Sequence, residues 1–230
     1  MSIAENLQRI REEIEQACAR AHRDPATVAL MAVSKMHPAE ALIEAYAAGQ
    51  RLFGENRVQE AQAKSPHLQH LPDLRLHLIG PLQNNKTSKA AELFHAIDTL
   101  DSPRTAARLN EAAAKLNKRL PVLIEVKLSP EETKHGIAPE NLPSLLDGLA
   151  PLDHLEPRGL MTVPPWSEHP ETARPYFHRL RQLRDENLAR CPPLTDLSMG
   201  MSNDFRVAIE EGSTTVRIGT AIFGKRQPAV

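Results

Sequence analysis

The sequence predicts an α/β fold, a single (β/α)8 TIM barrel over residues 1–230 with an extra helix before the first strand. Short apolar runs rich in branched residues alternate with longer helical stretches, which is typical of parallel strands joined by crossover helices. Eight such runs occur, and eight strand–helix units close naturally into a barrel. The 230 residues are 41% hydrophobic, which suffices for one continuous core and leaves no room for a second large domain.

The first element is an amphipathic helix over residues 3–21. Its apolar side chains recur at helical spacing on one face, opposite a face of Arg and Glu, and they are Ile3, Leu7, Ile10, Ile14 and Cys18. The segment from Ser2 to Glu5, with acidic residues in the first turns, indicates a helix start. We therefore expect no secretion signal at this end of the chain.

The barrel elements follow in order along the chain. The expected strands are 28–33, 51–53, 75–79, 95–100, 122–126, 156–161, 194–199 and 215–218. Helical stretches lie between them, among them 38–48, 102–116 and 170–188, and Pro103 suits a first helical position. An open doubly wound sheet is the alternative, but such sheets often carry a glycine-rich phosphate turn after the first strand. This chain has none.

Composition narrows the class of protein. The net charge is −1 with a pI near 6.8, which argues against partners such as nucleic acid or an anionic membrane surface. No apolar run approaches the roughly 20 residues needed to cross a bilayer. Two distant cysteines, Cys18 and Cys191, suggest neither a disulfide framework nor a zinc site, and the histidines lack metal-ligand spacing. We expect a soluble, cytoplasmic protein without a metal.

Candidate chemistry collects where the strands end, because ligands of such barrels bind at the carboxyl ends of the strands. The last two loops have the parts of a phosphate site: Ser202, Asn203 or Asp204 can cap a helix, and Gly219 with Thr220 lets an anion approach closely. Helix capping plus a tight turn explains either loop alone. Their occurrence on consecutive strands leaves phosphate binding as an equal interpretation.

For four further features of the sequence, two interpretations are open. Lys35 ends the first strand, where it is either a desolvated nucleophilic amine or an ordinary surface lysine at the barrel mouth. Arg217 faces either the barrel interior or the helices. His77 inside the third strand is more often a satisfied core histidine than a ligand. The proline-rich loop 163–166 is more readily explained by turn chemistry than by a direct role.

Several sequence blocks match a known family in order along nearly the whole chain. They are Ala32-Val33-Ser34-Lys35, Phe53-Gly54-Glu55-Asn56 with Gln59-Glu60, His77-Leu78-Ile79-Gly80 with Leu82-Gln83-Asn84-Asn85-Lys86, Gly159-Leu160-Met161, Leu197-Ser198-Met199-Gly200-Met201-Ser202, and Val216-Arg217-Ile218-Gly219-Thr220. In these blocks the chain resembles the pyridoxal phosphate homeostasis proteins, whose fold is like the barrel domain of alanine racemase.

The resemblance implies a site for pyridoxal 5'-phosphate. By this matching Lys35 forms the Schiff base, Arg217 faces the pyridine nitrogen, and Asn56 and His77 line the ring pocket. The phosphate falls to Ser202, Gly219 and Thr220, and Ser198 of the same block is also a candidate cofactor-binding residue. One departure follows the fifth strand, where relatives often carry asparagine and this chain has Lys127.

The function implied is binding of the cofactor for storage, buffering or delivery, with apo forms of pyridoxal phosphate-dependent enzymes as possible recipients, and without established turnover. The alternative is an amino-acid racemase or decarboxylase that uses the same Schiff base. A racemase of the related fold needs a second domain and an opposing tyrosine, whereas Tyr46 and Tyr176 fall in expected helices. A Schiff-base aldolase without cofactor is a third, more distant interpretation. We expect a monomer, because no dimerisation domain is evident.

Overall fold

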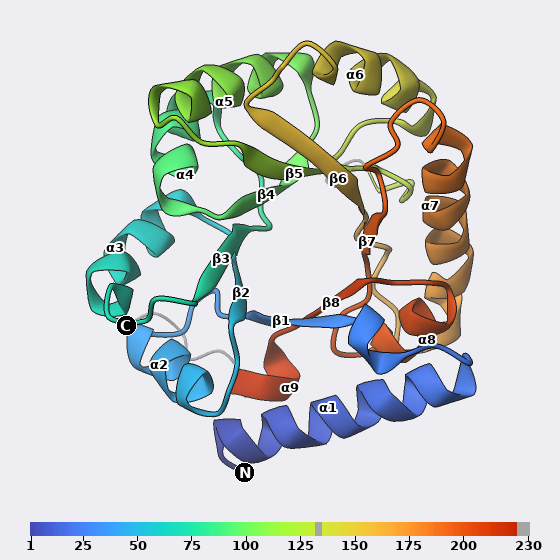
Figure 1. The fold of residues 1–230 in the computed structure, drawn as a ribbon. Helices are drawn as coiled ribbons and strands as arrows, with labels where there is room; N and C mark the ends of the chain where they lie inside the picture. Colours follow the sequence, from blue (N-terminus) through green and yellow to red (C-terminus); the bar gives the residue numbers. More distant parts are fainter. Residues whose placement is uncertain (132–134, 225–230) are drawn as a thin grey trace.

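The strands form a closed parallel barrel in the computed structural model, which describes residues 1–131 and 135–224 (Figure 1). Within these residues the order is β1 to β8, and β8 pairs with β1 through Ala32 and Ile218. The bounds are β1 Ala29–Val33, β2 Leu52–Glu55, β3 Arg75–Leu78, β4 Ala96–Leu100, β5 Leu120–Glu125, β6 Leu155–Met161, β7 Asp196–Ser198 and β8 Thr215–Ile218. The predicted barrel is confirmed.

Helices surround the barrel (Figure 1). They are α1 Ile3–Arg20, α2 Ala39–Ala47, α3 Val58–Leu68, α4 Thr87–Leu93, α5 Pro103–Lys115, α6 Leu142–Leu149, α7 Arg174–Asn187, α8 Phe205–Glu210 and α9 Thr220–Phe223. Short 3-10 turns cover Pro25–Thr27, Asn84–Lys86, Pro139–Asn141 and Pro170–Ala173. Ser2 and Glu5 close a capping box at the start of α1, as a helix start requires. None of the described helices is both long and apolar enough to cross a membrane.

Alternation along the strands divides the barrel into an apolar outer layer and a polar interior. Val216 and Ile218 belong to the apolar core that the helices cover, while Arg217 between them is buried and bonds to groups of other strands. Arg217 therefore faces the barrel interior, which decides between the two orientations open at the sequence level. His77 of β3 and Asp98 of β4 pair in the same interior.

Most strand boundaries differ from expectation by one or two residues, and two of these differences have a clear physical cause. The second strand extends to Glu55 and does not stop at Phe53, because its last carboxylate is buried and ion-paired and so continues the strand without an apolar side chain. The seventh strand begins only at Asp196, since Leu194 is bonded back to Cys191 in a turn. The first difference places a carboxylate at the carboxyl end of β2, and the second shortens β7 at its opposite, amino-terminal end.

Candidate functional site

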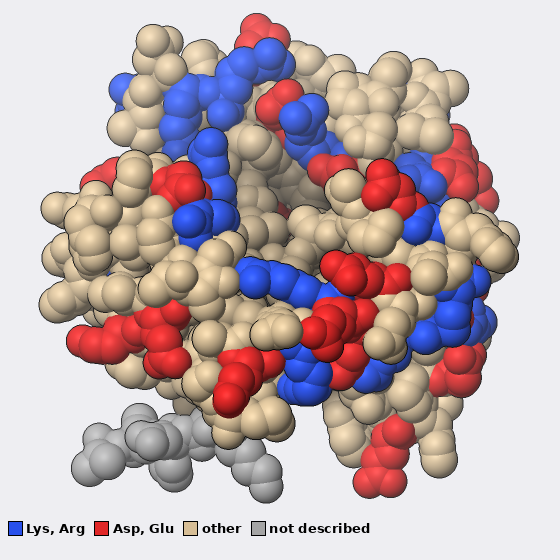
Figure 2. Space-filling view, turned by 60° about the horizontal axis from the view of Figure 1, so that its bottom comes forward, with Lys and Arg blue, Asp and Glu red and all other residues tan. Residues whose placement is uncertain are grey.

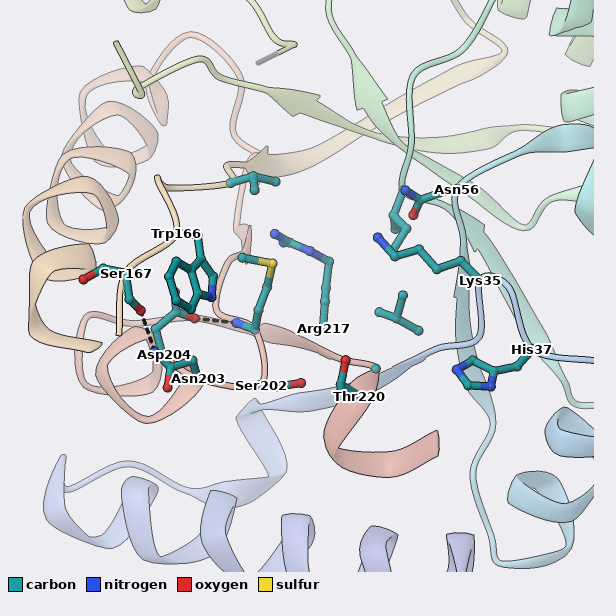
Figure 3. Close-up of a pocket in the computed structure, with 15 residues that line it drawn as sticks. Lys35, His37, Asn56, Trp166, Ser167, Ser202, Asn203, Asp204, Arg217 and Thr220 are labelled. Atoms are coloured by element: carbon teal, nitrogen blue, oxygen red, sulfur yellow. Dashed lines mark hydrogen bonds between the residues drawn. The ribbon is translucent and has the colours of Figure 1, made fainter. Parts of the chain in front are cut away.

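A cavity of about 450 Å³ opens at the carboxyl ends of the strands. It is lined by Val33, Lys35, His37, Asn56, Ile79, Val163, Trp166, Ser167, Met201, Ser202, Asn203, Asp204, Arg217, Gly219 and Thr220. These residues come from β8 and from the ends of, or loops after, β1, β2, β3, β6, β7 and β8 (Figure 3). The surface in Figure 2 is hollowed, and Lys and Arg alternate there with Asp and Glu around the hollow.

Lys35 lies in a turn directly after β1. The His37 amide donates to the Ser34 carbonyl at 3.1 Å across this turn, and Met36 takes a left-handed conformation with φ 62°. Figure 3 shows the Lys35 side chain pointing into the cavity on the side of Asn56, with Arg217 across from it. An amine and a guanidinium thus face one cavity from opposite sides.

The Arg217 guanidinium is fixed by two hydrogen bonds inside the barrel. One nitrogen donates to Ser198 Oγ at 2.8 Å and the other terminal nitrogen to the Thr162 carbonyl at 2.9 Å. Burial lowers the pKa of Arg217, and the carboxylates of Asp98 and Glu125 act in the opposite direction. An arginine still holds its proton in such a setting, so the cavity floor carries a fixed positive charge.

The loops after β7 and β8 supply hydroxyl and backbone groups to the cavity. Figure 3 shows the hydroxyls of Ser202 and Thr220 on neighbouring loops. Gly219 lies against β1, since a Cβ there would come within 3.2 Å of the Val33 carbonyl. Asp204 precedes α8 but its side chain does not cap the helix; the carboxylate accepts from the Met201 amide at 2.6 Å. The capping expected of this loop is thus replaced by a turn, and burial raises the pKa of Asp204.

Asn56 presents a buried acceptor at the cavity wall. Its Oδ1 has no hydrogen-bond partner among the described residues. The Asn56 backbone is fixed by close packing, because a Cβ on Gly80 would come within 2.3 Å of the Asn56 carbonyl. Leaving a buried polar atom without a partner is costly, so a ligand that donates to Asn56 would be favoured.

Six of the eight residues predicted for cofactor binding line this cavity: Lys35, Asn56, Ser202, Arg217, Gly219 and Thr220. The other two do not. His77 pairs with Asp98, its Nδ1 3.1 Å from that buried carboxylate, and its place in the ring pocket stays a prediction. Ser198 does not line the cavity but accepts a hydrogen bond from Arg217, which does. Lys127, the departure noted after the fifth strand, is not among the lining residues.

Sequence reasoning missed the part of the wall that follows β6. Trp166 and Ser167 line the cavity, and Trp166 is 74% exposed. Asn203 Nδ2 donates to the Ser167 carbonyl at 2.8 Å, which ties this loop to the one after β7 (Figure 3). The loop's position at a strand end was the available signal, but its prolines favoured an interpretation as a plain turn. His37 was also missed; its ring lies 5.0 Å from that of Phe223.

The comparisons with known proteins agree over the whole fold. Residues 5–227 match the family model of the alanine racemase N-terminal domain. A pyridoxal phosphate homeostasis protein of Aquifex aeolicus is 46% identical over 99% of this chain and its own full length. The structure of PipY of Synechococcus elongatus PCC7942 with PLP bound matches with 43% identity and a TM-score of 0.88, over 97% of this chain and 100% of that one.

An alanine racemase of Clostridium difficile 630 shares the fold alone, at 16% identity and a TM-score of 0.72, over 99% of this chain and 57% of that one. The identity to the homeostasis proteins, by contrast, extends from end to end of both chains. The chain therefore belongs to the pyridoxal phosphate homeostasis protein family, within the larger family defined by the alanine racemase N-terminal domain.

Proposed function

We propose that this chain binds pyridoxal 5'-phosphate in the cavity and serves the intracellular homeostasis of that cofactor by storing, buffering or delivering it. The observation that carries the proposal is the meeting of Lys35 and Arg217 across one cavity whose rim holds the hydroxyls of Ser202 and Thr220 (Figure 3). Each of these groups matches a different part of the cofactor: aldehyde, ring nitrogen and phosphate. The family membership and the relative with PLP bound support the same assignment.

The residues present fit this cofactor chemically. A volume of about 450 Å³ lies within the range of small-molecule sites. Asn56 Oδ1 offers a buried acceptor that lacks a partner, and the cofactor carries donor groups on its ring. The Gly219 backbone permits the close approach that a phosphate requires, because it bears no side chain. When bound, pyridoxal phosphate supplies an electrophilic aldehyde conjugated to an electron-withdrawing ring.

Lys35 is proposed to hold the cofactor covalently. Its neutral amine adds to the aldehyde carbon, a C=N bond forms as the Schiff base, and the aldehyde oxygen leaves as water. Holding the aldehyde in this form protects other amines from it. Arg217 would face the ring nitrogen as a hydrogen-bond donor that stays charged and does not pass on its proton, so the ring remains a weak electron sink.

Racemization or decarboxylation is the second candidate, because two titratable side chains line the cavity besides Lys35 and Arg217. These are His37 and Asp204, whose side chains are of types that accept and donate protons. Neither Tyr46 nor Tyr176 lines it, and Tyr46 is engaged with Asp73 on the outer surface. We therefore propose a carrier without an established turnover, acting as a monomer in the cytoplasm.

The absorbance spectrum of the purified protein with pyridoxal phosphate tests this assignment, before and after borohydride. We expect a Schiff-base band in the wild type that borohydride abolishes, and no such band in Lys35→Ala. Lys127→Ala is the matched control, since that lysine follows β5 at the same rim without lining the cavity. Peptide mapping of the reduced protein should locate the label on Lys35.

The same samples decide between carrier and enzyme. Amino-acid racemase and decarboxylase assays without turnover, together with reactivation of an apo enzyme by the loaded protein, would support the carrier. Turnover lost in Lys35→Ala would establish the enzyme instead. A wild type with no band would refute the Lys35 assignment, and gel filtration at several concentrations would test the monomer.

A further inference from the structure

The peptide groups on both sides of Lys35 are held by side chains that do not line the cavity. The Lys64 ammonium donates to the Ser34 carbonyl at 2.9 Å, which belongs to the peptide entering Lys35. The Met36 amide, in the peptide leaving Lys35, donates to the Glu60 carboxylate. Lys64 Nζ also lies 2.8 Å from Glu60 Oε1, so one ammonium connects the two restraints.

A third group completes this cluster. Glu55 Oε1 accepts from Lys64 Nζ at 2.7 Å and from the Ser34 hydroxyl at 2.6 Å. The ammonium has three protons, and the structure provides three acceptors for them: the Ser34 carbonyl, Glu55 and Glu60. Ser34 is thus hydrogen-bonded to the cluster through both its carbonyl and its hydroxyl.

The cluster is largely buried, so its ion pairs are shielded from water. The side chains of Lys64 and Glu55 are 8% and 0% exposed, and that of Glu60 is 22% exposed. Burial raises the pKa of Glu55 while the Lys64 ammonium opposes that rise. Lysine is almost never buried unless it is paired, and removing one partner leaves the others with an uncompensated charge.

The turn that carries Lys35 contains a strained residue directly after the lysine. Met36 adopts a left-handed φ of 62°, which costs a non-glycine residue free energy, and its side chain is 53% exposed. The bond from its amide to Glu60 offsets that cost. Loss of the cluster would remove this bond from the strained residue and the Lys64 bond from the Ser34 carbonyl.

We propose that Lys64, with Glu55 and Glu60, is a positioning set that fixes the backbone around Lys35 and thereby aims its amine into the cavity. This rests on the proposed function, in which Lys35 bonds to pyridoxal phosphate. None of the three side chains lines the cavity; the set acts on the two peptide groups between which Lys35 lies.

The test compares Lys64→Met with Lys118→Met in the full chain. Lys118 is a matched control: its ammonium donates to the Phe94 carbonyl at 3.0 Å, at the opposite end of the barrel. Both variants should unfold at a lower temperature. Only Lys64→Met should release bound pyridoxal phosphate faster, by roughly tenfold, the scale on which loss of a supporting partner weakens a binding group. The visible circular dichroism per bound cofactor should fall in parallel.

Glu60→Gln guards against a Lys64 variant that fails to fold. It removes the charge but keeps an oxygen for the Met36 amide, so we expect a smaller rise in release rate in the same direction. Release rate and visible dichroism unchanged from the wild type in both variants would overturn the proposal. Equal effects in Lys118→Met would do so too, because they would show a general loss of stability.

Hydrogen exchange of the cofactor-free protein separates this proposal from the proposed function. Lys64→Met and Glu60→Gln should speed exchange of the Met36 amide, while Lys118→Met should not. A wild type without a Schiff-base band would refute the function, but the exchange would still decide whether the cluster holds the turn. Unchanged exchange in both variants would refute the positioning set.

Discussion

Replacing Arg217 by methionine should destabilise the protein strongly even without any ligand. Arg217 is 4% exposed, and its charge balances Asp98 and Glu125, which are 1% and 8% exposed. Removing one partner of a buried charge cluster costs about 3–5 kcal/mol, because the remaining charges keep their desolvation cost. Ser198 Oγ and the Thr162 carbonyl would also lose their donors. For a chain of this length the loss corresponds to roughly 6–20 °C in Tm.

Urea unfolding of the cofactor-free protein at pH 7, followed by far-ultraviolet circular dichroism, measures this loss. Asp98→Asn in the Arg217→Met background should restore about 1 kcal/mol or more, since the two sites are coupled. Arg217→Lys, which keeps the charge, should cost less.

A deficit below about 1 kcal/mol at pH 7, on the scale of an exposed ion pair, would show that the barrel interior does not depend on this charge. A large deficit that Asp98→Asn leaves unchanged in the Arg217→Met background would attribute the loss to packing. Either result would refute the electrostatic reasoning.

Three further predictions test other parts of the molecule. Burial lowers the pKa of His95 from 6.5, and its Nδ1 accepts from the Leu76 amide. The stability that the neutral ring gives is present above pH 6.5 and lost as pH falls. His95→Asn should therefore reduce the pH dependence of the unfolding free energy between about pH 5 and 7. Gly200 has a φ of +94°, and a Cβ there would lie 2.5 Å from the Cβ of Ala208. Gly200→Ala should therefore lower the free energy of unfolding in urea by about 2–5 kcal/mol. Gly148 lies in α6 and a Cβ there meets nothing within 4 Å, so Gly148→Ala should raise that free energy by up to about 1 kcal/mol. Trp166, the single tryptophan of the chain, lines the cavity, so titration with pyridoxal phosphate should quench its fluorescence; unchanged emission at saturation would place the ligand elsewhere.

The barrel could be predicted from the sequence because its signal is repeated eight times. Each strand has branched apolar residues that contact helices on one side, and this pattern survives an error of one or two residues at any boundary. The end of β2 was missed because Gly54 and Glu55 carry no apolar signal. Glu55 belongs to the strand through its ion pair with Lys64, which only the folded chain brings together.

The rim of the site followed from one rule, that ligands bind where the strands of such a barrel end. That rule selected Lys35 and Asn56, which follow the first two strands, before any coordinates. It could not orient Arg217 and His77, because both lie within strands. The barrel turns Arg217 toward Ser198 and aligns His77 with Ala96 of β4, next to Asp98, and no sequence pattern fixes that register.

The positioning set around Lys35 could not be predicted from the sequence, because its spacing on α3 is that of an ordinary surface pair. On α3 a lysine four residues after a glutamate reads as a solvated surface pair, and such pairs contribute little. Here the same spacing turns both side chains toward the end of β1, where Lys64 donates to the Ser34 carbonyl and Glu60 accepts from the amide of the left-handed Met36. The value of the pair comes from what it meets across the loop, about thirty residues away in the chain. A helical charge pattern thus cannot distinguish a solvated pair from a buried support, and a release rate measured in Lys64→Met can.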